Sequence, residues 1–288
     1  MSGRNPKAVI VGASQGIGAK TAKWLALKGW DVAICARNRL RLNEVSHELR
    51  SSGSSRVLSK VLDASDSDNL KDFADQISEE WGGVSLLICS AAVLGPIGSI
   101  RSIDPNKMRE AIDINVLGTF NSVWAFSQLL FQQEGSRAVL LAGGGLGGAR
   151  PIGGAYGYVP SKAFSVLLVE LLSREFAANN GAICSISPGL MSTGFMKPAL
   201  SETASDVPDD LANAARAQQN LISDDLAVTQ YFHLMTRFLS SEGLAMNGKL
   251  ISARWDQDVI FGEPSELYTD SMFQLRRIDD TMFTNVRK

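Results

Sequence analysis

The sequence predicts a single doubly wound α/β domain built on a seven-stranded parallel sheet with helices on both faces. Three observations lead to this prediction. Short apolar runs recur along the chain, segments with helical spacing of their apolar residues separate most of them, and a glycine-rich turn follows the first run. Parallel strands need long crossover connections, and strands covered on both faces are apolar throughout. The alternation therefore predicts a parallel sheet between two layers of helices.

The strands are expected at seven short runs rich in Val, Ile and Leu. In chain order these runs are KAVIVG (7–12), DVAICA (31–36), RVLSKVLD (56–63), SLLICSA (85–91), AVLLAG (138–143), AICSIS (182–187) and GKLISA (248–253). The helices are expected between them, over residues 17–28, 38–51, 67–80, 105–132, 158–178 and 224–240.

One domain is expected over residues 1–255, with an insertion between its last two strands. Residues 194–223, which form this insertion, are polar and contain prolines. A long connection at this place is more often a lid or a substrate wall than a plain loop. Residues 256–288 form an extension with apolar side chains such as Phe261 and Tyr268, which we expect to pack on the domain or on a partner subunit.

Composition and charge exclude several classes of function. The 28 Lys and Arg residues nearly balance the 30 Asp and Glu residues, so no net charge attracts nucleic acid or an anionic membrane. The chain enters its first strand without a secretory signal, and no apolar run reaches the roughly 20 residues of a membrane helix. Cys35, Cys89 and Cys184 lie in apolar runs and are expected as buried thiols, and two isolated histidines do not suggest a metal site. We expect a cytoplasmic protein with a small-molecule substrate.

The turn after the first strand, VGASQGIG, contains Gly12, Gly16 and Gly18. Glycine permits a tight turn and lets a diphosphate approach the backbone, where free N–H groups and the dipole of the next helix favour negative charge. At the first strand-to-helix turn of an α/β chain, this pattern predicts a nucleotide site.

Tyr158 and Lys162 are four positions apart at the start of a predicted helix, so their side chains share a face. A phenol with a pKa of about 10 is a poor acid or base at neutral pH, and a nearby cation lowers that pKa. Pro160 is tolerated in the first turn of a helix. The pair therefore predicts a general acid or base. Tyr156 has a proline at the same spacing and is not expected to take part.

The glycine spacing G-x-x-x-G-x-G, together with Tyr-x-x-x-Lys, resembles the short-chain dehydrogenase/reductase family, which has a Rossmann-type fold. The resemblance runs from residue 6 to residue 255. It also includes Asp63 at the end of the third strand, Asn115 in INVLGTF, and Pro188, Gly189 and Thr193 in SPGLMST.

The resemblance implies roles for these residues. Tyr158 would exchange a proton with the substrate oxygen, Lys162 would also hold the nicotinamide ribose, and Asn115 would support a proton relay through water. Asp63 would hold the adenine, and Thr193 the nicotinamide amide. The full set of expected cofactor contacts is Gly12, Ser14, Gln15, Gly16, Ile17, Gly18, Arg37, Asn38, Asp63, Ala64, Ala91, Tyr158, Lys162, Pro188, Gly189 and Thr193.

The end of the second strand favours NADP(H) over NAD(H). Enzymes that prefer NAD usually place an acid here to bind the ribose 2′-hydroxyl, whereas this chain has Ala36 followed by Arg37, a cation for a 2′-phosphate. Ser14 and Asn38 are further candidate contacts. The alternative is that Arg37 is simply a solvated residue at a helix start.

The serine of the resembled family, thirteen residues before the tyrosine, is absent, because Gly145 stands there and no Ser or Thr occurs between Arg137 and Tyr158. Losing one such donor typically removes about 3 kcal/mol of transition-state stabilisation. Backbone N–H groups of the glycines at 143–148, a bound water or a hydroxyl of the substrate could replace it. The family's NNAG after the fourth strand reads CSAA (89–92).

We interpret the chain as an NADP(H)-dependent carbonyl reductase or alcohol dehydrogenase in which Tyr158, Lys162 and Asn115 are catalytic. A weaker likeness to a subgroup with a glycine triplet and GKLISAxWD (248–256) suggests a polar, sugar-like substrate. The alternatives are a non-redox enzyme on the same scaffold, such as a dehydratase, cyclase or isomerase, and a nucleotide-binding protein without turnover. Apolar positions in 105–132 and 158–178 exceed what one sheet face needs, and the resemblance implies a homodimer or homotetramer.

Overall fold

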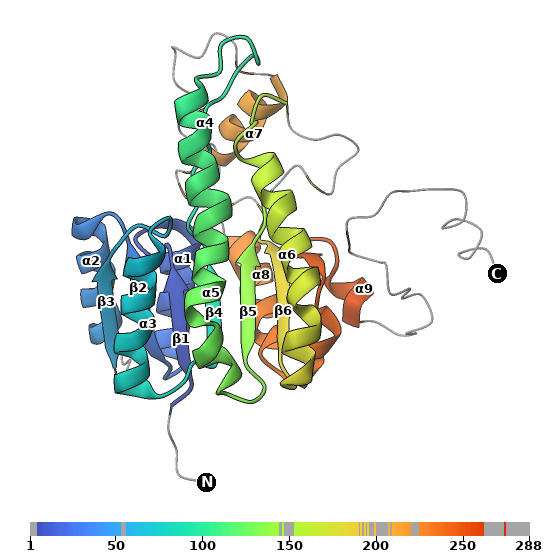
Figure 1. Cartoon of the computed structure of the whole chain (residues 1–288). Helices are drawn as coiled ribbons and strands as arrows, with labels where there is room; N and C mark the ends of the chain where they lie inside the picture. The colour runs from blue at the N-terminus through green and yellow to red at the C-terminus, as the bar shows by residue number, and fades with distance from the viewer. Residues whose placement is uncertain are drawn as a thin grey trace, which may run out of the picture.

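A computed structural model describes residues 5–52, 56–143, 146, 153–189, 191, 193, 195, 199, 207, 209–219, 225–261 and 274 (Figure 1). It contains the predicted seven-stranded sheet, in the order β3-β2-β1-β4-β5-β6-β7, and every neighbouring pair of strands is parallel. The strands are β1 Lys7–Val11, β2 Asp31–Ala36, β3 Val57–Val61, β4 Leu86–Cys89, β5 Arg137–Leu141, β6 Ala182–Ser187 and β7 Leu250–Ser252. The predicted fold class is confirmed.

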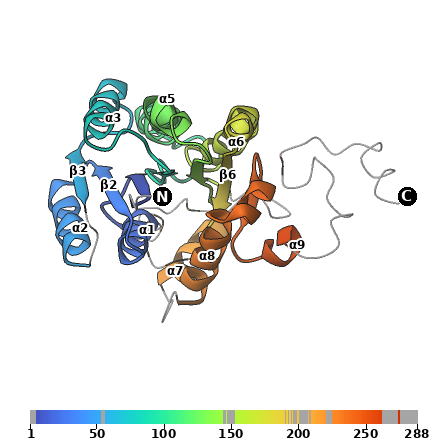
Figure 2. The same cartoon turned by 90° about the horizontal axis from the view of Figure 1, so that it is seen from below.

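Helices cover both faces of the sheet, as Figure 2 shows. On one face lie α3 (Ser67–Trp81), α5 (Gly118–Phe131) and α6 (Val159–Ala178). On the other lie α1 (Gly16–Leu27), α2 (Arg39–Ser51) and α8 (Asp225–Phe238). Each face has its own buried apolar cluster, and the strand residues alternate between the two clusters. This is the two-sided burial that continuous apolar strands require.

Side-chain caps fix where three of the helices begin. Asn38, Asp66 and Asp104 each accept a hydrogen bond from a backbone N–H in the first turn of α2, α3 and α4 (Pro105–Ile112), respectively. Such caps satisfy donors that have no partner inside the helix. Helix α1 differs, because Gln15 at its N-terminus makes no such bond.

The helix predicted over 105–132 is interrupted, which corrects that prediction. Between α4 and α5 lies a π-helical turn, η1 (Asp113–Leu117). Asn115 lies in this turn and is fully buried. Its side-chain amide donates to the carbonyl of Val93 and accepts from the N–H of Val93, both at 2.8 Å. The π turn therefore holds the segment that follows β4.

Three elements were not predicted: α7 (Asp209–Gln219), the 3-10 helix η3 (Ser241–Met246) and α9 (Gln257–Phe261). Helix α7 lies within the expected insertion, most of whose other residues are outside the described part of the chain. The same holds for the expected C-terminal extension beyond α9, except for Gln274.

Two further observations concern the described residues only. Cys35, Cys89 and Cys184 are buried and carry free thiols, as predicted. None of the described helices combines the length and the apolar character that crossing a membrane requires.

Candidate active site

One large cavity, of about 1040 Å³, opens along the carboxyl ends of the strands. These ends point upward in Figure 1. The cavity spans the place where the strand order reverses, between β1 and β4, which is where open α/β sheets bind their ligands. Its volume is at the upper end of the range for cofactor and ligand sites, about 300 to 1,000 Å³.

The glycines after β1 are required by close backbone contacts. Gly12 has a φ of +91°, and a Cβ there would lie 2.3 Å from the backbone nitrogen of Ala91. A Cβ on Gly18 would lie 2.3 Å from the carbonyl oxygen of Gly12. The glycine-rich turn leads into α1, whose N-cap residue makes no side-chain cap hydrogen bond. A backbone cradle at an uncapped helix N-terminus suits a diphosphate, so these residues fit a dinucleotide.

Two arginines lie at the end of the cavity near β2. Arg37 is exposed, and its Nη1 atom is 3.5 Å from the Oδ2 atom of Asp63. The other carboxylate oxygen of Asp63 accepts hydrogen bonds from the backbone N–H and hydroxyl of Ser65, at 2.9 and 2.8 Å. Arg41 also lines the cavity and donates to the side chain of Gln15. Sequence reasoning missed Arg41, although its position one helical turn after Arg37 was a usable signal.

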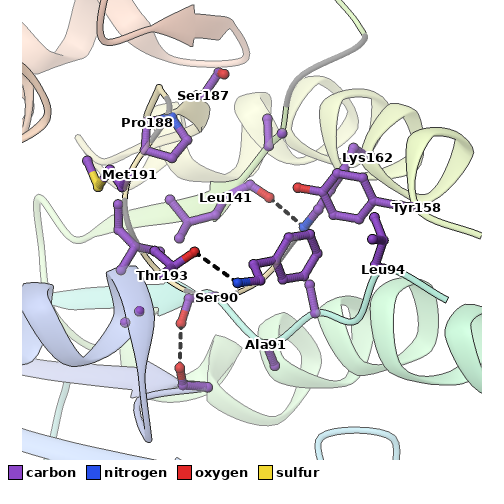
Figure 3. Close-up of a pocket in the computed structure, with 18 of the residues that line it drawn as sticks. Ser90, Ala91, Leu94, Leu141, Tyr158, Lys162, Ser187, Pro188, Met191 and Thr193 are labelled. Carbon is purple, nitrogen blue, oxygen red and sulfur yellow. Dashed lines mark hydrogen bonds between the residues drawn. The ribbon is translucent and has the colours of Figure 1, made fainter. Parts of the chain in front are cut away.

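Tyr158 and Lys162, the pair predicted to act as acid and base, lie at the other end of the cavity, where α6 begins. Tyr158 occupies the N-cap position, and Pro160 falls in the first turn, where it is tolerated. Lys162 is buried, and its Nζ atom donates to the carbonyl of Leu141 at 2.8 Å. Nζ also lies 5.4 Å from the centroid of the Tyr158 ring. Figure 3 shows both side chains directed into the cavity beside the end of β5.

Burial, rather than the neighbouring charge, controls the acidity of both groups in this structure. It raises the pKa of the Tyr158 phenol above its ordinary value, and it lowers the pKa of Lys162 to about 8. The expectation that Lys162 lowers the pKa of Tyr158 is therefore not met in the free site. Removing water disfavours the charged form of each group.

The position expected for the missing serine, Gly145, lies outside the described residues. The described neighbour of the Tyr158 hydroxyl is Gly143, just after β5. A Cβ on Gly143 would lie 2.0 Å from that hydroxyl oxygen. Within the described part of the chain, a glycine thus lies against the hydroxyl oxygen of the phenol.

A group of apolar residues surrounds Tyr158 on the side away from the cradle. The ring of Phe195 packs against the ring of Tyr158, with centroids 5.0 Å apart. Phe195 follows β6, and its N–H donates to the hydroxyl of Thr193 at 3.3 Å. Phe195 and Leu211 belong to the 194–223 insertion, which the sequence analysis expects to form a lid or a substrate wall. The individual members of the wall were not predicted, because no local pattern connects them. The described lining residues of this wall are Leu94, Leu146, Ala155, Val159, Phe195 and Leu211.

Every cofactor contact expected from the sequence, from Gly12 to Thr193, lines the cavity. Asn115 does not, because it is buried with its amide bonded to Val93. Tyr156 is partly exposed and also lies outside the lining. The lining includes Ser90, Met191, Arg254 and Trp255, which were not predicted.

Comparisons with known proteins match this arrangement. The family model described as short chain dehydrogenase matches residues 6–204. A 3-oxoacyl-[acyl-carrier-protein] reductase from Staphylococcus epidermidis is 25% identical over 249 residues, covering 85% of this chain and 98% of that protein.

Two solved structures have the same fold. A short chain dehydrogenase from Shigella flexneri, complexed with NADP, superposes with a TM-score of 0.71 at 21% identity, covering 87% of this chain and 97% of the other. NAD+-bound xylitol dehydrogenase superposes with a TM-score of 0.73 at 22% identity, covering 88% and 98%.

Proposed function

The chain belongs to the short chain dehydrogenase family, and on this premise we propose that it is an NADP(H)-dependent enzyme that interconverts a carbonyl group and an alcohol. The main support is that the glycine cradle and the Tyr158/Lys162 pair line one continuous cavity. A dinucleotide bound at the glycine cradle would therefore lie in the same cavity as the acid-base pair Tyr158 and Lys162. Convergence of a nucleotide cradle and a phenol with a perturbed pKa favours catalysis over binding alone.

Tyr158 is suited to donate a proton when a carbonyl is reduced. Because burial raises the pKa of its phenol, the hydroxyl keeps its proton at neutral pH. A bound nicotinamide would supply or accept the hydride. The phenol would pass its proton to the carbonyl oxygen, and the Lys162 ammonium would stabilise the phenolate that remains. In the reverse direction, the phenolate would accept the proton of an alcohol.

The preference for NADP(H) is supported by Arg37 and Arg41. Both cations line the end of the cavity where the adenosine half of a dinucleotide would lie, and a 2′-phosphate there would gain charge-assisted hydrogen bonds. Arg37 already faces Asp63, so a phosphate would compete with that carboxylate. Structural neighbours hold NADP or NADPH in two cases and NAD+ in another, so the preference proposed for this chain depends on these two side chains.

We assign Asn115 a positioning role. Its amide holds both backbone groups of Val93, in the segment that leads from β4 to the apolar wall at Leu94. A π turn of this kind is common at functional sites because it redirects side chains and backbone.

We also propose that the protein forms a homodimer or homotetramer through α5 and α6. These helices lie side by side on one face, as both views show (Figures 1 and 2). Large apolar side chains are exposed there on η1, α5 and α6, namely Leu117, Phe120, Trp124, Leu167 and Leu171. An apolar patch of this kind marks an interaction surface, and a pair of packed helices matches itself about a two-fold axis.

The test is a screen of carbonyl compounds with NADPH, using wild type, Tyr158→Phe and the matched control Tyr156→Phe. The proposal predicts NADPH oxidation that falls about 100-fold or more in Tyr158→Phe, the usual contribution of a general acid, and is unchanged in Tyr156→Phe. Product formation without net oxidation of NADPH would indicate a non-redox enzyme. Tight NADPH binding without turnover across the panel would indicate a binding protein.

A further inference from the structure

The cavity has two chemically different halves. The half near β1, β2 and β3 is lined by polar and charged side chains, including Ser14, Gln15, Arg37 and Asp63. The half around Tyr158 is lined by a wall contributed by segments distant in the sequence. Among the described residues, the lining side chains of this wall are all apolar apart from Tyr158, namely Leu94, Leu146, Ala155, Val159, Phe195 and Leu211. Ser90, which also lines the cavity after β4, donates its hydroxyl to the carbonyls of Val11 and Gly12.

The wall is preformed rather than loosely arranged. Leu94, Ala155 and Leu211 are almost fully buried, with exposed fractions of 4%, 3% and 1%. They form one apolar cluster, against which Phe195 and Tyr158 pack. Phe195 covers one side of the phenol, with its ring centroid 5.0 Å from that of Tyr158. A substrate whose carbonyl meets the Tyr158 hydroxyl must therefore place its neighbouring atoms against hydrocarbon.

Apart from Lys162, the described charged residues of the lining come from other segments. Arg37, Arg41 and Asp63 belong to the β2 and β3 end, and Arg254 and Asp256 follow β7. Lys162 is bonded to the carbonyl of Leu141. Hydroxyl groups next to the reacting carbonyl would lose water against the described apolar side chains of this wall, which offer them no partner. Each unpaired polar group costs about tenfold or more in affinity.

We propose that the substrate is an uncharged carbonyl compound, or the corresponding alcohol, whose reacting carbon carries a hydrocarbon group. This inference rests on the proposed function and replaces the polar, sugar-like substrate suggested by the sequence. Apolar pockets with few polar groups typically bind the hydrocarbon portion of a ligand and orient it through one hydrogen bond. Here that bond is made by the Tyr158 hydroxyl.

The experiment compares ketones of matched shape in which methyl groups are exchanged for hydroxyls. 3-Pentanone is paired with 1,3-dihydroxyacetone, and 2-butanone with hydroxyacetone. A ladder of 2-alkanones from butanone to octanone measures the effect of each added methylene. NADPH oxidation gives kcat/KM, and calorimetry with the NADP+ complex, in which a ketone cannot be reduced, gives binding without turnover.

We expect kcat/KM and affinity to rise about fourfold per methylene until the wall is filled, the usual effect of burying one such group. 3-Pentanone should exceed dihydroxyacetone by about tenfold or more. Phe195→Ala enlarges the cavity beside Tyr158, so the highest kcat/KM should move to longer 2-alkanones. Leu40 is exposed and lies outside the cavity, so Leu40→Ala should leave the dependence on 2-alkanone length unchanged.

The outcomes separate this inference from the proposed function. A kcat/KM that is higher for dihydroxyacetone than for 3-pentanone, and that does not rise with the length of the 2-alkanone, would overturn the proposed substrate class. The reductase proposal would remain intact. Affinity that rises with 2-alkanone length in calorimetry, without NADPH oxidation in the presence of any ketone, would support the apolar wall. It would contradict the proposal that the protein is a reductase. Absence of both binding and turnover would overturn both.

Discussion

The hydroxyl of Tyr158 lies against the Cα of Gly143, at a distance where a Cβ on the glycine would approach the hydroxyl oxygen to 2.0 Å. The phenol thus occupies the space that any side chain at position 143 would need. A serine at position 143 would therefore clash with the phenol in this arrangement. The described arrangement of Tyr158 and Lys162 requires a glycine at the end of β5.

Replacing Gly143 tests this relationship. Gly143→Ala and Gly143→Ser should each lower kcat by about 100-fold, because displacing a catalytic group by about 1 Å has an effect of that size. Both variants should still bind NADPH, which fluorescence titration can check. A Gly143→Ser enzyme more active than wild type would show instead that the site has only lost a hydroxyl.

The rate of carbonyl reduction should depend on the protonation of Lys162. Burial lowers the pKa of this amine to about 8, so it is an ammonium below that pH and neutral above it. Only the ammonium stabilises the phenolate left on Tyr158, so kcat/KM for NADPH should fall about tenfold per pH unit above about 8. Lys162→Arg keeps its charge and should remove this decline, whatever its absolute rate. A wild-type profile that stays level from pH 7 to pH 9.5 would count against the assignment.

Arg37 and Arg41 should govern the choice of cofactor. Arg37→Ala and Arg41→Ala should each weaken NADPH binding by about tenfold to a hundredfold, the effect of losing a hydrogen bond between charged groups, and change NADH binding much less. Arg39→Ala is the matched control, since Arg39 is exposed on α2, the helix that carries Arg41, and does not line the cavity. Equal losses for NADPH and NADH would argue that the arginines do not contact a 2′-phosphate.

The apolar face of α5 and α6 should hold subunits together. Trp124 is 49% exposed and Leu171 is 76% exposed, which is unusual for side chains of this size. Trp124→Glu and Leu171→Glu should convert the oligomer to monomer in sedimentation velocity, because a buried charge without a partner is costly. Leu40 on α2 is as exposed as Leu171, and Leu40→Glu should leave the oligomer intact. A monomeric wild type at micromolar concentration would contradict the proposed interface.

Local patterns were sufficient to predict most of the fold. Every strand was expected from a run rich in Val, Ile and Leu. The pattern is clearest in β1, β4 and β5, whose residues are all buried, and weaker in the edge strand β3, whose Ser59 is exposed. The dinucleotide cradle followed from glycines at one turn, where close backbone approaches leave no room for a Cβ at Gly12 or Gly18. The π turn at Asp113–Leu117 was not predictable, since one extra residue within a long helix barely disturbs the spacing of apolar positions.

The chemistry of the site depended on contacts that sequence spacing does not contain. Tyr158 and Lys162 were found from their separation along one helix, but their pKa values follow from burial by distant segments. Phe195 reaches Tyr158 from the segment after β6, 37 positions away. Gly143 lies against the phenol, a contact that a count back along the chain from the tyrosine does not reveal.

The central claim is that Tyr158 supplies a proton while hydride passes between nicotinamide and substrate. Its most direct test uses NADPH carrying deuterium in both C4 positions, a reducible ketone, and mass spectrometry of the product from wild type and Tyr158→Phe. We predict one deuterium on the former carbonyl carbon in the wild-type product, and at least 100-fold slower labelling by the variant. A product formed without deuterium, or labelled equally fast by Tyr158→Phe, would contradict the claim.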